Sequence, residues 1–457
     1  MQRPYLNIFV PHCSDLLTDH LPHGDGLIAH GSMTSLARRG HHLHVAAKNV
    51  NLREPLHPNI TLHPISLSTT GRISPRLEYM FRIRNLLGRL QKNCRFDLIH
   101  QLNPVFTGIS LSLVGSGLPL VLGTYVARWP DEQNSPFLAA KCVGSAAAIA
   151  RSIISDIQQR NADAIILTTP AAFNRLPRPA ALRERIHMLP HGLDTDLFSP
   201  AAGWDSASRL ATEQQNPSIL FLANVLERKG IFTLVEALAM VVREIPSAIL
   251  RIAGDGPELA EVKRRVSNLD CVRSVEFLGR QERNNTPDLY RNSAVYCLPS
   301  FGEPYGTTAV EAMSCARALV VTDIGGLPHI VHACGGKRVP VGDAVSLGNA
   351  LIGLLRNPAE RRSMGLYNRQ LVETTMSWDA VAEQLEEIYM KTLERFPNNR
   401  AAGWYGQKSK PTYLLPETRL PESNIIVNAS ADSRGYFGAP AYSSEKLTGG
   451  SIVRPRL

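Results

Sequence analysis

The chain has 457 residues, of which 44% are hydrophobic and 19% charged, and its formal net charge is +9. This length exceeds what one hydrophobic core supports, so we expect a globular protein of two domains. No run approaches eighteen apolar residues, and the short apolar run near the N-terminus does not fit a signal peptide. Seven cysteines without a CxxC pair argue against a disulfide framework or a zinc site and favour a cytoplasmic location.

The basic residues are dispersed and not interleaved with aromatic residues, so we expect no nucleic-acid partner. Arg72 and Lys92 bound a segment in which apolar residues recur at helical spacing among arginines. Two interpretations stay open: a surface helix packed on a sheet, or a helix in peripheral contact with the inner face of an anionic membrane. Its apolar face is expected to contain Leu77, Met80, Phe81, Leu87 and Leu90.

Short β-branched runs alternate with helical patterns through the first 170 residues. Helices are expected over residues 26–39, 74–93 and 145–160. This alternation is typical of a parallel sheet with helices on both faces. Strands are expected over residues 5–10, 42–47, 59–65, 97–101, 119–123 and 163–169.

The same alternation resumes at residue 218 and predicts a second doubly wound domain. Between the two, a polar and small-residue-rich stretch predicts a linker, and the last helical pattern ends at residue 396. Beyond it, proline, serine and glycine recur without hydrophobic periodicity, so we expect a tail that is disordered or loosely attached. The predicted parts are residues 1–200, the linker 201–217, residues 218–380, a closing helix 381–396 and the tail 397–457.

Ligands of doubly wound sheets bind outside the carboxyl ends of the strands, so the functional residues are expected in the loops there. Arg228 and Lys229 follow one strand and precede Gly230 and a helix, which suits an anion site, although taken alone this loop fits a solvated basic turn better. After the next strand, Gly254 and Gly256 allow close approach of a ligand or only a tight turn. A GxGxxG dinucleotide motif is not formed.

The stretch GEPYGTTAVEA places Glu303 in a post-strand loop and Glu311 within the following helix. Thr308 and Glu311 fit a capping box, which gives Glu311 a structural role, whereas Glu303 has no such role. The backbone N–H groups of Gly306, Thr307 and Thr308 are suited to an anion. Cations, helix N-termini and carboxylates together favour a ligand with a diphosphate and hydroxyl groups, which describes a nucleotide sugar.

The motifs EPYGTTAVEAMSCARALVVTDIGG at 303–326, RKG at 228–230, AGDGP at 253–257, FLGR at 277–280 and PHGLDTDLFSP at 190–200 are distinctive together. In them the chain, over about residues 5–395, resembles a retaining GT-B glycosyltransferase of glycosyltransferase family 4. The resemblance implies two Rossmann-like domains facing a cleft, an acceptor-side domain followed by a nucleotide-sugar donor domain. It also implies that the closing helix crosses back onto the first domain, and that neither a metal nor a cofactor is needed.

The resemblance implies roles for the motif residues. Glu303 would contact the donor sugar, and Lys229 with Arg228 would stabilise the diphosphate as a leaving group. Glu311 would bind the ribose. The other donor-binding candidates are Gly306, Thr307, Thr308, Gly254, Gly256 and Arg280, and the acceptor-side candidates are Gly24, Gly26, Tyr125 and His191.

Three positions depart from the family pattern. Asn224 stands where an arginine of the phosphate clamp is typical, and His329 replaces a glutamate. Tyr125 lies roughly where the family often has a histidine, and a tyrosine or backbone contact could replace it. These departures leave room for reduced activity.

The leading hypothesis is a retaining hexosyltransferase that moves a sugar from a nucleoside diphosphate donor to a glycan, lipid-linked or small-molecule acceptor. One alternative is a nucleotide-sugar epimerase of the same architecture, although no acid/base set for it is identified. The other is a catalytically weak nucleotide-sugar-binding protein on this fold.

Overall fold

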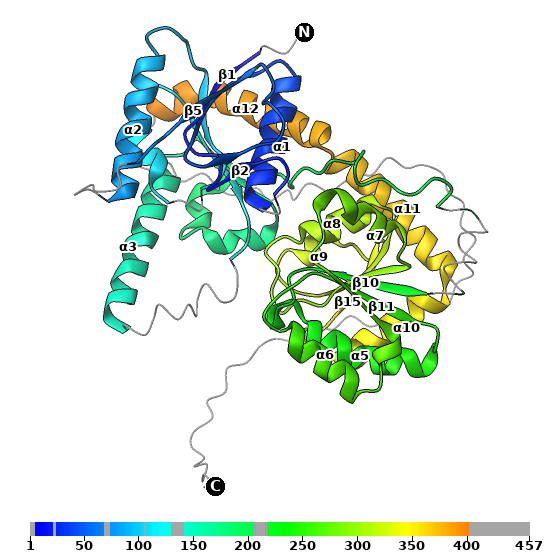
Figure 1. The fold of residues 1–457 in the computed structure, drawn as a ribbon. Helices are drawn as coiled ribbons and strands as arrows, with labels where there is room; N and C mark the ends of the chain where they lie inside the picture. Colours follow the sequence, from blue (N-terminus) through cyan, green and yellow to red (C-terminus); the bar gives the residue numbers. More distant parts are fainter. Residues whose placement is uncertain are drawn as a thin grey trace, which may run out of the picture. The chain divides into compact units, whose positions relative to one another are not determined.

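A computed structural model of the chain describes residues 5–21, 24–67, 74–104, 107–128, 141–204, 206, 215 and 217–401. These residues belong to one compact unit that spans residues 1–403. The expected α/β class is confirmed, because the described chain forms two parallel sheets with helices packed on them (Figure 1). Among the described residues, no helix is long and apolar enough to cross a membrane.

The first sheet is fully parallel, and its strand order reverses at its third and fourth strands. Its crevice for ligands is therefore expected between the loops that follow these two strands. The spatial order is β5 (Ile60–Pro64), β3 (His42–Ala47), β1 (Asn7–Val10), β6 (Leu98–Gln101), β7 (Leu120–Tyr125), β8 (Ala164–Leu167) and β9 (Ile186–Met188).

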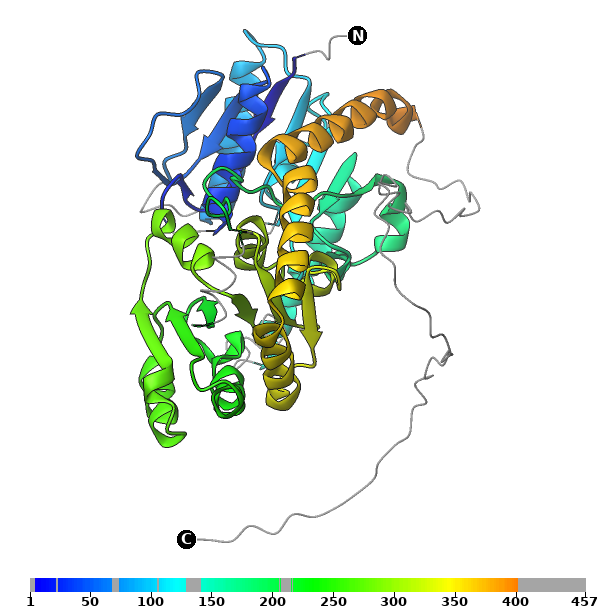
Figure 2. The same cartoon turned by 90° about the vertical axis from the view of Figure 1, so that its right-hand side faces the viewer.

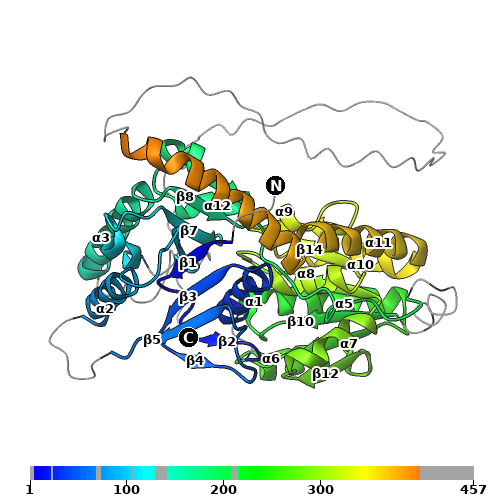
Figure 3. The same cartoon turned by 90° about the horizontal axis from the view of Figure 1, so that it is seen from above.

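Alternate residues of these strands serve two cores, one on each face of the sheet. Ile8 and Val10 pack beneath α1 (Gly24–Arg38), whereas Phe9 packs on the side of α2 (Pro75–Leu90). Figure 3 shows α1 and α2 on opposite sides of the strands. A third helix, α3 (Lys141–Arg160), precedes β8, and β2 (Leu17–Thr18) pairs with β4 (Val50–Asn51) beside the main sheet.

The second sheet repeats the design with six parallel strands. The chain leaves its third and fourth strands, β10 and β13, in opposite directions, which makes their carboxyl ends the second topological switch point. The spatial order is β12 (Val275–Gly279), β11 (Ile249–Ala253), β10 (Ser218–Leu222), β13 (Val295–Leu298), β14 (Ala318–Thr322) and β15 (Gly336–Val339).

Helices cover both faces of the second sheet (Figure 1). One face carries α5 (Ile231–Glu244), α6 (Leu259–Asn268) and α10 (Ala344–Arg356). The other carries α7 (Thr286–Arg291), α8 (Thr307–Ser314), α9 (Leu327–Ile330) and α11 (Pro358–Thr375).

The long helix α12 (Trp378–Ala401) follows α11 and packs on the first sheet (Figure 2). Its carboxylate Glu386 accepts two hydrogen bonds from Arg39, at 2.6 and 2.9 Å, and one from His41 Nε2 at 3.0 Å. His41 Nδ1 accepts the backbone N–H of Leu6, which fixes Nε2 as the donor to Glu386. The buried apolar residues of α12 are Val381, Ala382, Leu385, Ile388 and Tyr389.

Most predicted elements of the first half are confirmed, with shifts of a few residues at their ends. The missed strands of the described first half are the two-residue β2 and β4 and the three-residue β9, which are too short to show a period. The predicted linker lies mainly outside the described residues, and so does the predicted tail beyond residue 401. The last predicted helix, expected to end at residue 396, continues to Ala401.

The predicted apolar face of α2 is wrong in part. Leu77 and Phe81, expected on that face, are 49% and 61% exposed. The helix turns a neighbouring face toward the sheet because that face carries the larger set of bulky residues. The side chains buried there are Tyr79, Ile83, Leu86 and Leu87.

Candidate active site

The carboxyl ends of β10 and β13 carry the two loops in which the catalytic residues are predicted. β10 leads into a 3-10 turn at Glu227–Lys229, and β13 leads into the loop that contains Glu303. Lys229 Nζ lies 2.5 Å from Glu303 Oε2, and the two side chains are only 14% and 8% exposed. Two motifs that are 74 residues apart therefore meet as one ion pair at the switch point of the second sheet.

A glycine holds these two loops against each other. Gly230 has a φ of +75°, and a Cβ there would lie 1.8 Å from the carbonyl oxygen of Pro299. The backbone N–H of Phe301 donates to the carbonyl of Arg228 at 2.9 Å. A side chain at position 230 would push the loops apart, so Gly230 sets the spacing of the ion pair.

A pair of glycines fixes the backbone of Glu303. The N–H of Gly326 donates to the Glu303 carbonyl at 2.8 Å. Gly325 has a φ of +62°, and a Cβ there would lie 2.2 Å from the same carbonyl oxygen. His329, the departure in this segment, is exposed on the short helix α9.

The predicted capping box at the start of α8 is wrong. The helix begins at Thr307, and its N-cap is Gly306 in the left-handed region, without a side-chain capping bond. The Thr308 hydroxyl accepts from Tyr296 Oη at 2.7 Å. The first N–H groups of any α-helix have no carbonyl partner inside the helix, so α8 keeps the anion-binding potential expected of residues 306–308.

Glu311 points to a buried polar cluster and not back to the helix start. Its Oε1 accepts from Arg283 at 3.2 Å, and its Oε2 accepts from the Tyr290 hydroxyl at 2.8 Å. Burial raises the pKa of Glu311, and the Arg283 charge and the Tyr290 hydrogen bond oppose this rise. The carboxyl group is thus held in one orientation by two partners.

Gly254 and Gly256 serve loop packing. A Cβ at these positions would lie 1.9 Å from the carbonyl oxygen of Ala223 and 2.1 Å from that of Val225. The close approach at these glycines is to the neighbouring backbone, and their proposed part in donor binding stays a prediction. Backbone hydrogen bonds hold the loop after β10 against the loop after β11. Asn224 is exposed within the loop after β10.

Arg280 is linked to Glu311 indirectly, through Arg283. It lines a cavity of about 350 Å³ together with Arg283, and Arg53 and His20 of the first half line the same cavity. Arg283 is the residue of this group that reaches Glu311. The cavity is therefore rich in cations beside the carboxyl group predicted to bind ribose.

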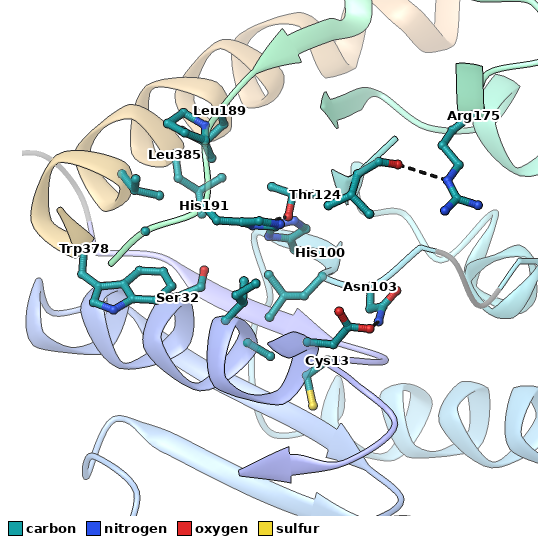
Figure 4. Close-up of a pocket in the computed structure, with 18 residues that line it drawn as sticks. Cys13, Ser32, His100, Asn103, Thr124, Arg175, Leu189, His191, Trp378 and Leu385 are labelled. Carbon is teal, nitrogen blue, oxygen red and sulfur yellow. Dashed lines mark hydrogen bonds between the residues drawn. The ribbon is translucent and has the colours of Figure 1, made fainter. Parts of the chain in front are cut away.

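The switch point of the first sheet borders a different cavity, of about 190 Å³ (Figure 4). It is lined by residues that follow β1, β6 and β7, by the segment 189–192, and by α1 and α12. Polar side chains meet in its centre, where His100, Thr124 and His191 lie together, with Trp378 to one side and Arg175 to the other (Figure 4). Ile28, Leu102, Val126 and Leu385 give it apolar walls.

Two histidines of this cavity are buried and neutral. Burial lowers the pKa of both His100 and His191 from 6.5 to about 4. His100 Nε2–H donates to the Gly123 carbonyl at 2.9 Å, because that carbonyl can only accept, and Nδ1 then accepts from Tyr389 at 2.6 Å. His100 thus ties the end of β7 to α12.

His191 joins the two switch points. Its Nδ1 lies 3.2 Å from the Thr124 hydroxyl, and its backbone N–H donates to the Tyr305 hydroxyl at 2.9 Å. The rings of His191 and Tyr305 meet edge to face, with centroids 4.6 Å apart. Since Tyr305 follows Glu303 by two residues, the cavity of the first sheet adjoins the loop that contains Glu303.

The other acceptor-side predictions have mixed outcomes. Tyr125 is corrected: its ring lies in the core on the α2 face of the sheet, and Thr124 lines the cavity instead. Successive strand residues point to opposite faces, so an error of one position reverses the assignment. Gly24 and Gly26 begin α1 and flank Asp25, whose side chain lines the cavity.

Sequence reasoning missed Asp25, Asn103, His100 and Trp378. Asp25 and Asn103 were open to prediction, since each lies at or beyond the end of a predicted element of the first half. His100 sits inside a strand, and Trp378 begins a helix nearly 200 residues beyond the cavity's other walls. Only the tertiary fold brings those two into the cavity.

Among the described residues, no group of three or more His, Cys, Asp or Glu side chains is arranged to hold a metal ion. The expectation of a metal-independent reaction stays a prediction.

Family models match both halves of the chain. The model described as "Glycosyltransferase Family 4" matches residues 32–197, and "Glycosyl transferases group 1" matches residues 204–389. The chain is 22% identical over 385 residues to N-acetyl-alpha-D-glucosaminyl L-malate synthase of Bacillus anthracis, covering 82% of this chain and 96% of that enzyme. It is 30% identical over 245 residues to alpha-maltose-1-phosphate synthase of Mycolicibacterium smegmatis, covering 50% of this chain and 63% of that enzyme.

Solved structures share the fold at low sequence identity. Sucrose-phosphate synthase from Thermosynechococcus elongatus superposes with a TM-score of 0.62 at 22% identity, over 86% of this chain and all of that one. Anabaena HepE in complex with UDP superposes with a TM-score of 0.64 at 16% identity, over 84% of this chain and 100% of that one. The predicted fold, two Rossmann-like domains of the GT-B type, is confirmed.

Proposed function

This chain belongs to glycosyltransferase family 4 and has the GT-B fold, and from that premise we propose that it transfers a sugar, with retention, from a nucleoside diphosphate sugar to a hydroxyl acceptor. The observation that carries the proposal is the Lys229–Glu303 ion pair at the switch point of the second sheet. The pair combines a cation for phosphate and a carboxylate for sugar hydroxyls at the edge where such sheets bind ligands.

Donor binding exchanges the partners of this pair. Lys229 moves from Glu303 to the diphosphate, and Glu303 then accepts hydroxyl groups of the sugar. As the bond between the sugar C1 and the diphosphate breaks, negative charge grows on the leaving oxygen. A fixed ammonium in a water-poor site stabilises that charge strongly, so no metal is required in this proposal. The N–H groups at the start of α8, from Gly306 to Thr308, add to the stabilisation.

The departure at Asn224 shifts more of the phosphate binding to Lys229. Asn224 is exposed and carries no charge, so the clamp has one cation less than the family pattern. Arg228 is partly buried beside Lys229, and we propose that it contributes to the diphosphate site.

Glu311 is proposed to bind the ribose hydroxyls. Its two partners, Arg283 and Tyr290, keep the carboxyl group oriented toward the region between α7 and α8. The solved HepE structure contains UDP, which makes UDP-sugars the first donors to test. A relative of Corynebacterium glutamicum is named as GDP-mannose-dependent, so GDP-mannose is the second.

The exposed pair Leu77 and Phe81 on α2 supports a peripheral contact with an anionic membrane, which would suit a lipid-linked acceptor. Arg76, Arg84 and Arg89 are exposed on the same helix. Co-sedimentation with vesicles of phosphatidylglycerol, with phosphatidylcholine vesicles as the control, tests this contact. Binding that Phe81→Glu leaves unchanged would exclude it.

The proposed reaction is tested by incubating the protein with UDP-glucose, UDP-N-acetylglucosamine or GDP-mannose, with and without cell-extract acceptors, and measuring released nucleotide. Release that depends on acceptors and is lost in Glu303→Ala supports transfer. A changed sugar on an intact nucleotide supports the epimerase alternative. Binding of nucleotide sugar without either product supports the binding-protein alternative. Glu244→Gln, which alters an exposed carboxylate paired with Arg356, serves as the matched control.

A further inference from the structure

A short extension beside the main sheet of the first half reaches the second half. There β2 pairs with β4, and the backbone N–H of Leu17 donates to the carbonyl of Asn49 at 3.0 Å. Figure 3 shows these two strands on the side of the first half that borders the second. His20 and Arg53, which follow the two strands, line the cavity of about 350 Å³ together with residues 280–284. The two halves therefore form this cavity jointly.

Asp19 fixes the positions of His20 and Arg53. Its carboxylate accepts the backbone N–H of Arg53 at 3.0 Å and that of Glu54 at 2.9 Å, and His20 Nδ1 lies 2.7 Å from it. Burial acts to raise the pKa of Asp19, but the hydrogen bonds from His20, Glu54 and Arg53 outweigh burial and lower it. The carboxylate is therefore ionised, and it holds the backbone of Arg53.

Two guanidinium groups that line the cavity have no partner in the described part of the chain. They belong to Arg53 and Arg280, one from each half. A third arginine, Arg283, is already bonded to Glu311 at 3.2 Å. Glu282 is the one carboxylate among the described lining residues, and it is exposed. The cavity thus keeps a net positive charge.

This arrangement suits an anionic ligand. Two unneutralised guanidinium groups that line one cavity repel each other, and an anion between them removes the repulsion. The planar N–H donors of arginine match the oxygens of a phosphate or carboxylate group. The volume equals that of about twelve water molecules, so the cavity holds more than a single phosphate group. The ligand is therefore expected to be a small molecule that carries such a group.

The cavity is separate from the proposed diphosphate site. Its described lining includes neither Lys229 nor Glu303 nor the start of α8. Arg283 connects the two regions, since it lines the cavity and also contacts Glu311, the carboxyl group proposed to bind the ribose. An anion can therefore occupy the cavity while a nucleotide occupies the site at Lys229.

We propose that this cavity binds a second anion, the phosphate or carboxylate group of a small molecule, between Arg53 of the first half and Arg280 of the second. The inference goes beyond the proposed function, which needs one anion site at Lys229. It assigns Arg280, predicted to bind the donor, to a different ligand. Because the two arginines belong to different halves, the bound anion links the halves.

The test measures binding of inorganic phosphate and of succinate by calorimetry, on the full chain with saturating UDP to fill the proposed diphosphate site. One equivalent of at least one probe is expected to bind. Arg53→Gln and Arg280→Gln are each expected to raise the Kd of that probe by about 10- to 100-fold, the effect of losing hydrogen bonds between charged groups. The Kd for UDP is expected to stay the same in Arg53→Gln.

Two further variants serve as controls. Arg273→Gln is the matched control, because Arg273 is exposed in the same half as Arg280 and does not line the cavity. Lys229→Ala, measured without UDP, is expected to bind the probe as tightly as the wild type does with UDP. A merely structural role of Arg53 or Arg280 would change the melting temperature and leave the Kd of the probe unchanged.

Equal Kd values of the probe in the wild type, Arg53→Gln and Arg280→Gln overturn the inference. A loss confined to one of the two variants overturns the link between the halves. The inference also fails if neither probe binds saturably below about 10 mM, or if a probe competes with UDP. Failure of the wild type to bind UDP overturns the proposed function alone, because Lys229→Ala tests the second anion site without a nucleotide.

Discussion

The two switch points are built in different ways. At the second sheet, the working groups come from two loops, and glycines fix the spacing between them, so that Lys229 and Glu303 meet at 2.5 Å. At the first sheet, the cavity is assembled from α1, three post-strand segments, residues 189–192 and α12. The proposed donor side is thus built from two loops of one domain, whereas the cavity of the first sheet is the product of packing between segments more widely separated in the chain. A motif can therefore identify a donor site while the acceptor remains open.

The largest effect on activity is expected from removing the charges of the Lys229–Glu303 ion pair. Lys229→Ala and Glu303→Gln are each expected to lower kcat by about 10²- to 10³-fold, the usual effect of losing one charge-stabilising group. The double variant is expected to be little worse than either single variant, since the two side chains act as a unit. Steady-state kinetics on all three measures this. Losses that multiply in the double variant would show that the residues act separately.

The next largest effect is expected on stability, from a change in the packing beside the cavity of the first sheet. Trp378 fills the space beside Gly192, where a Cβ would lie 2.1 Å from its ring. Gly192→Ala is expected to lower the free energy of unfolding by about 2–3 kcal/mol through overpacking. Urea unfolding gives the change, and the nucleotide Kd is expected to stay the same.

Gly353→Ala is the matched control for that variant. Gly353 is exposed in α10, and a Cβ there would meet no described atom within 4 Å. It is expected to be neutral or stabilising by about 0.5–1 kcal/mol. Equal losses in Gly192→Ala and Gly353→Ala would contradict the proposed packing role of Trp378.

Lowering the pH is expected to destabilise the first half more than the second. Burial lowers the pKa of three histidines to about 4, and all three belong to the first half or to its junction with the second: His12, His100 and His191. A histidine whose pKa falls from 6.5 to about 4 on folding stabilises the protein fully above pH 6.5 and loses this contribution as the pH falls toward 4. For His100 the loss at pH 5 is about 2 kcal/mol relative to pH 7.5. Unfolding of His100→Gln is expected to depend less steeply on pH by that amount; an equal pH dependence would refute it.

The smallest effect concerns Glu311. Its pKa is raised by burial, so nucleotide affinity is expected to weaken a few-fold as the pH falls through that raised pKa and the carboxyl group is protonated. Arg283→Gln removes an opposing charge and is expected to move this weakening to higher pH. Calorimetry with UDP between pH 4.5 and 8, on both proteins, measures the shift. The same profile for both would argue against the ion pair in solution.

The sequence predicted the fold and the loops of the donor side because both depend on short-range patterns. Alternating strands and helices define the sheets, and RKG and EPYGTTAVEA lie at strand ends that parallel topology must bring together. The predicted roles of Glu303 and Lys229 in binding and catalysis stay predictions, although their contact is now established.

The errors arose where tertiary contacts decide. Glu311 fits a capping box by spacing, but Arg283 and Tyr290 supply partners from α7 and the turn before it, and these win over the helix start. Tyr125 was assigned to the cleft because it lies roughly where the family often has a histidine, whereas the pleat of the strand turns its ring into the core. The face of α2 was misjudged because its helical period fits two neighbouring stripes. None of these alternatives can be separated without knowing the neighbours.

Because α12 packs on the first sheet, the first domain cannot complete its core until the end of the described chain has been synthesised. The first sheet is encoded before residue 190, but five residues of its core and the carboxylate that binds Arg39 and His41 come from α12. At about 5–20 residues per second, a ribosome needs roughly 10–40 s to make the 200 residues in between. During that interval the core residues of the first sheet that pack on α12 lack this cover, so the last helix of the described residues completes the first domain.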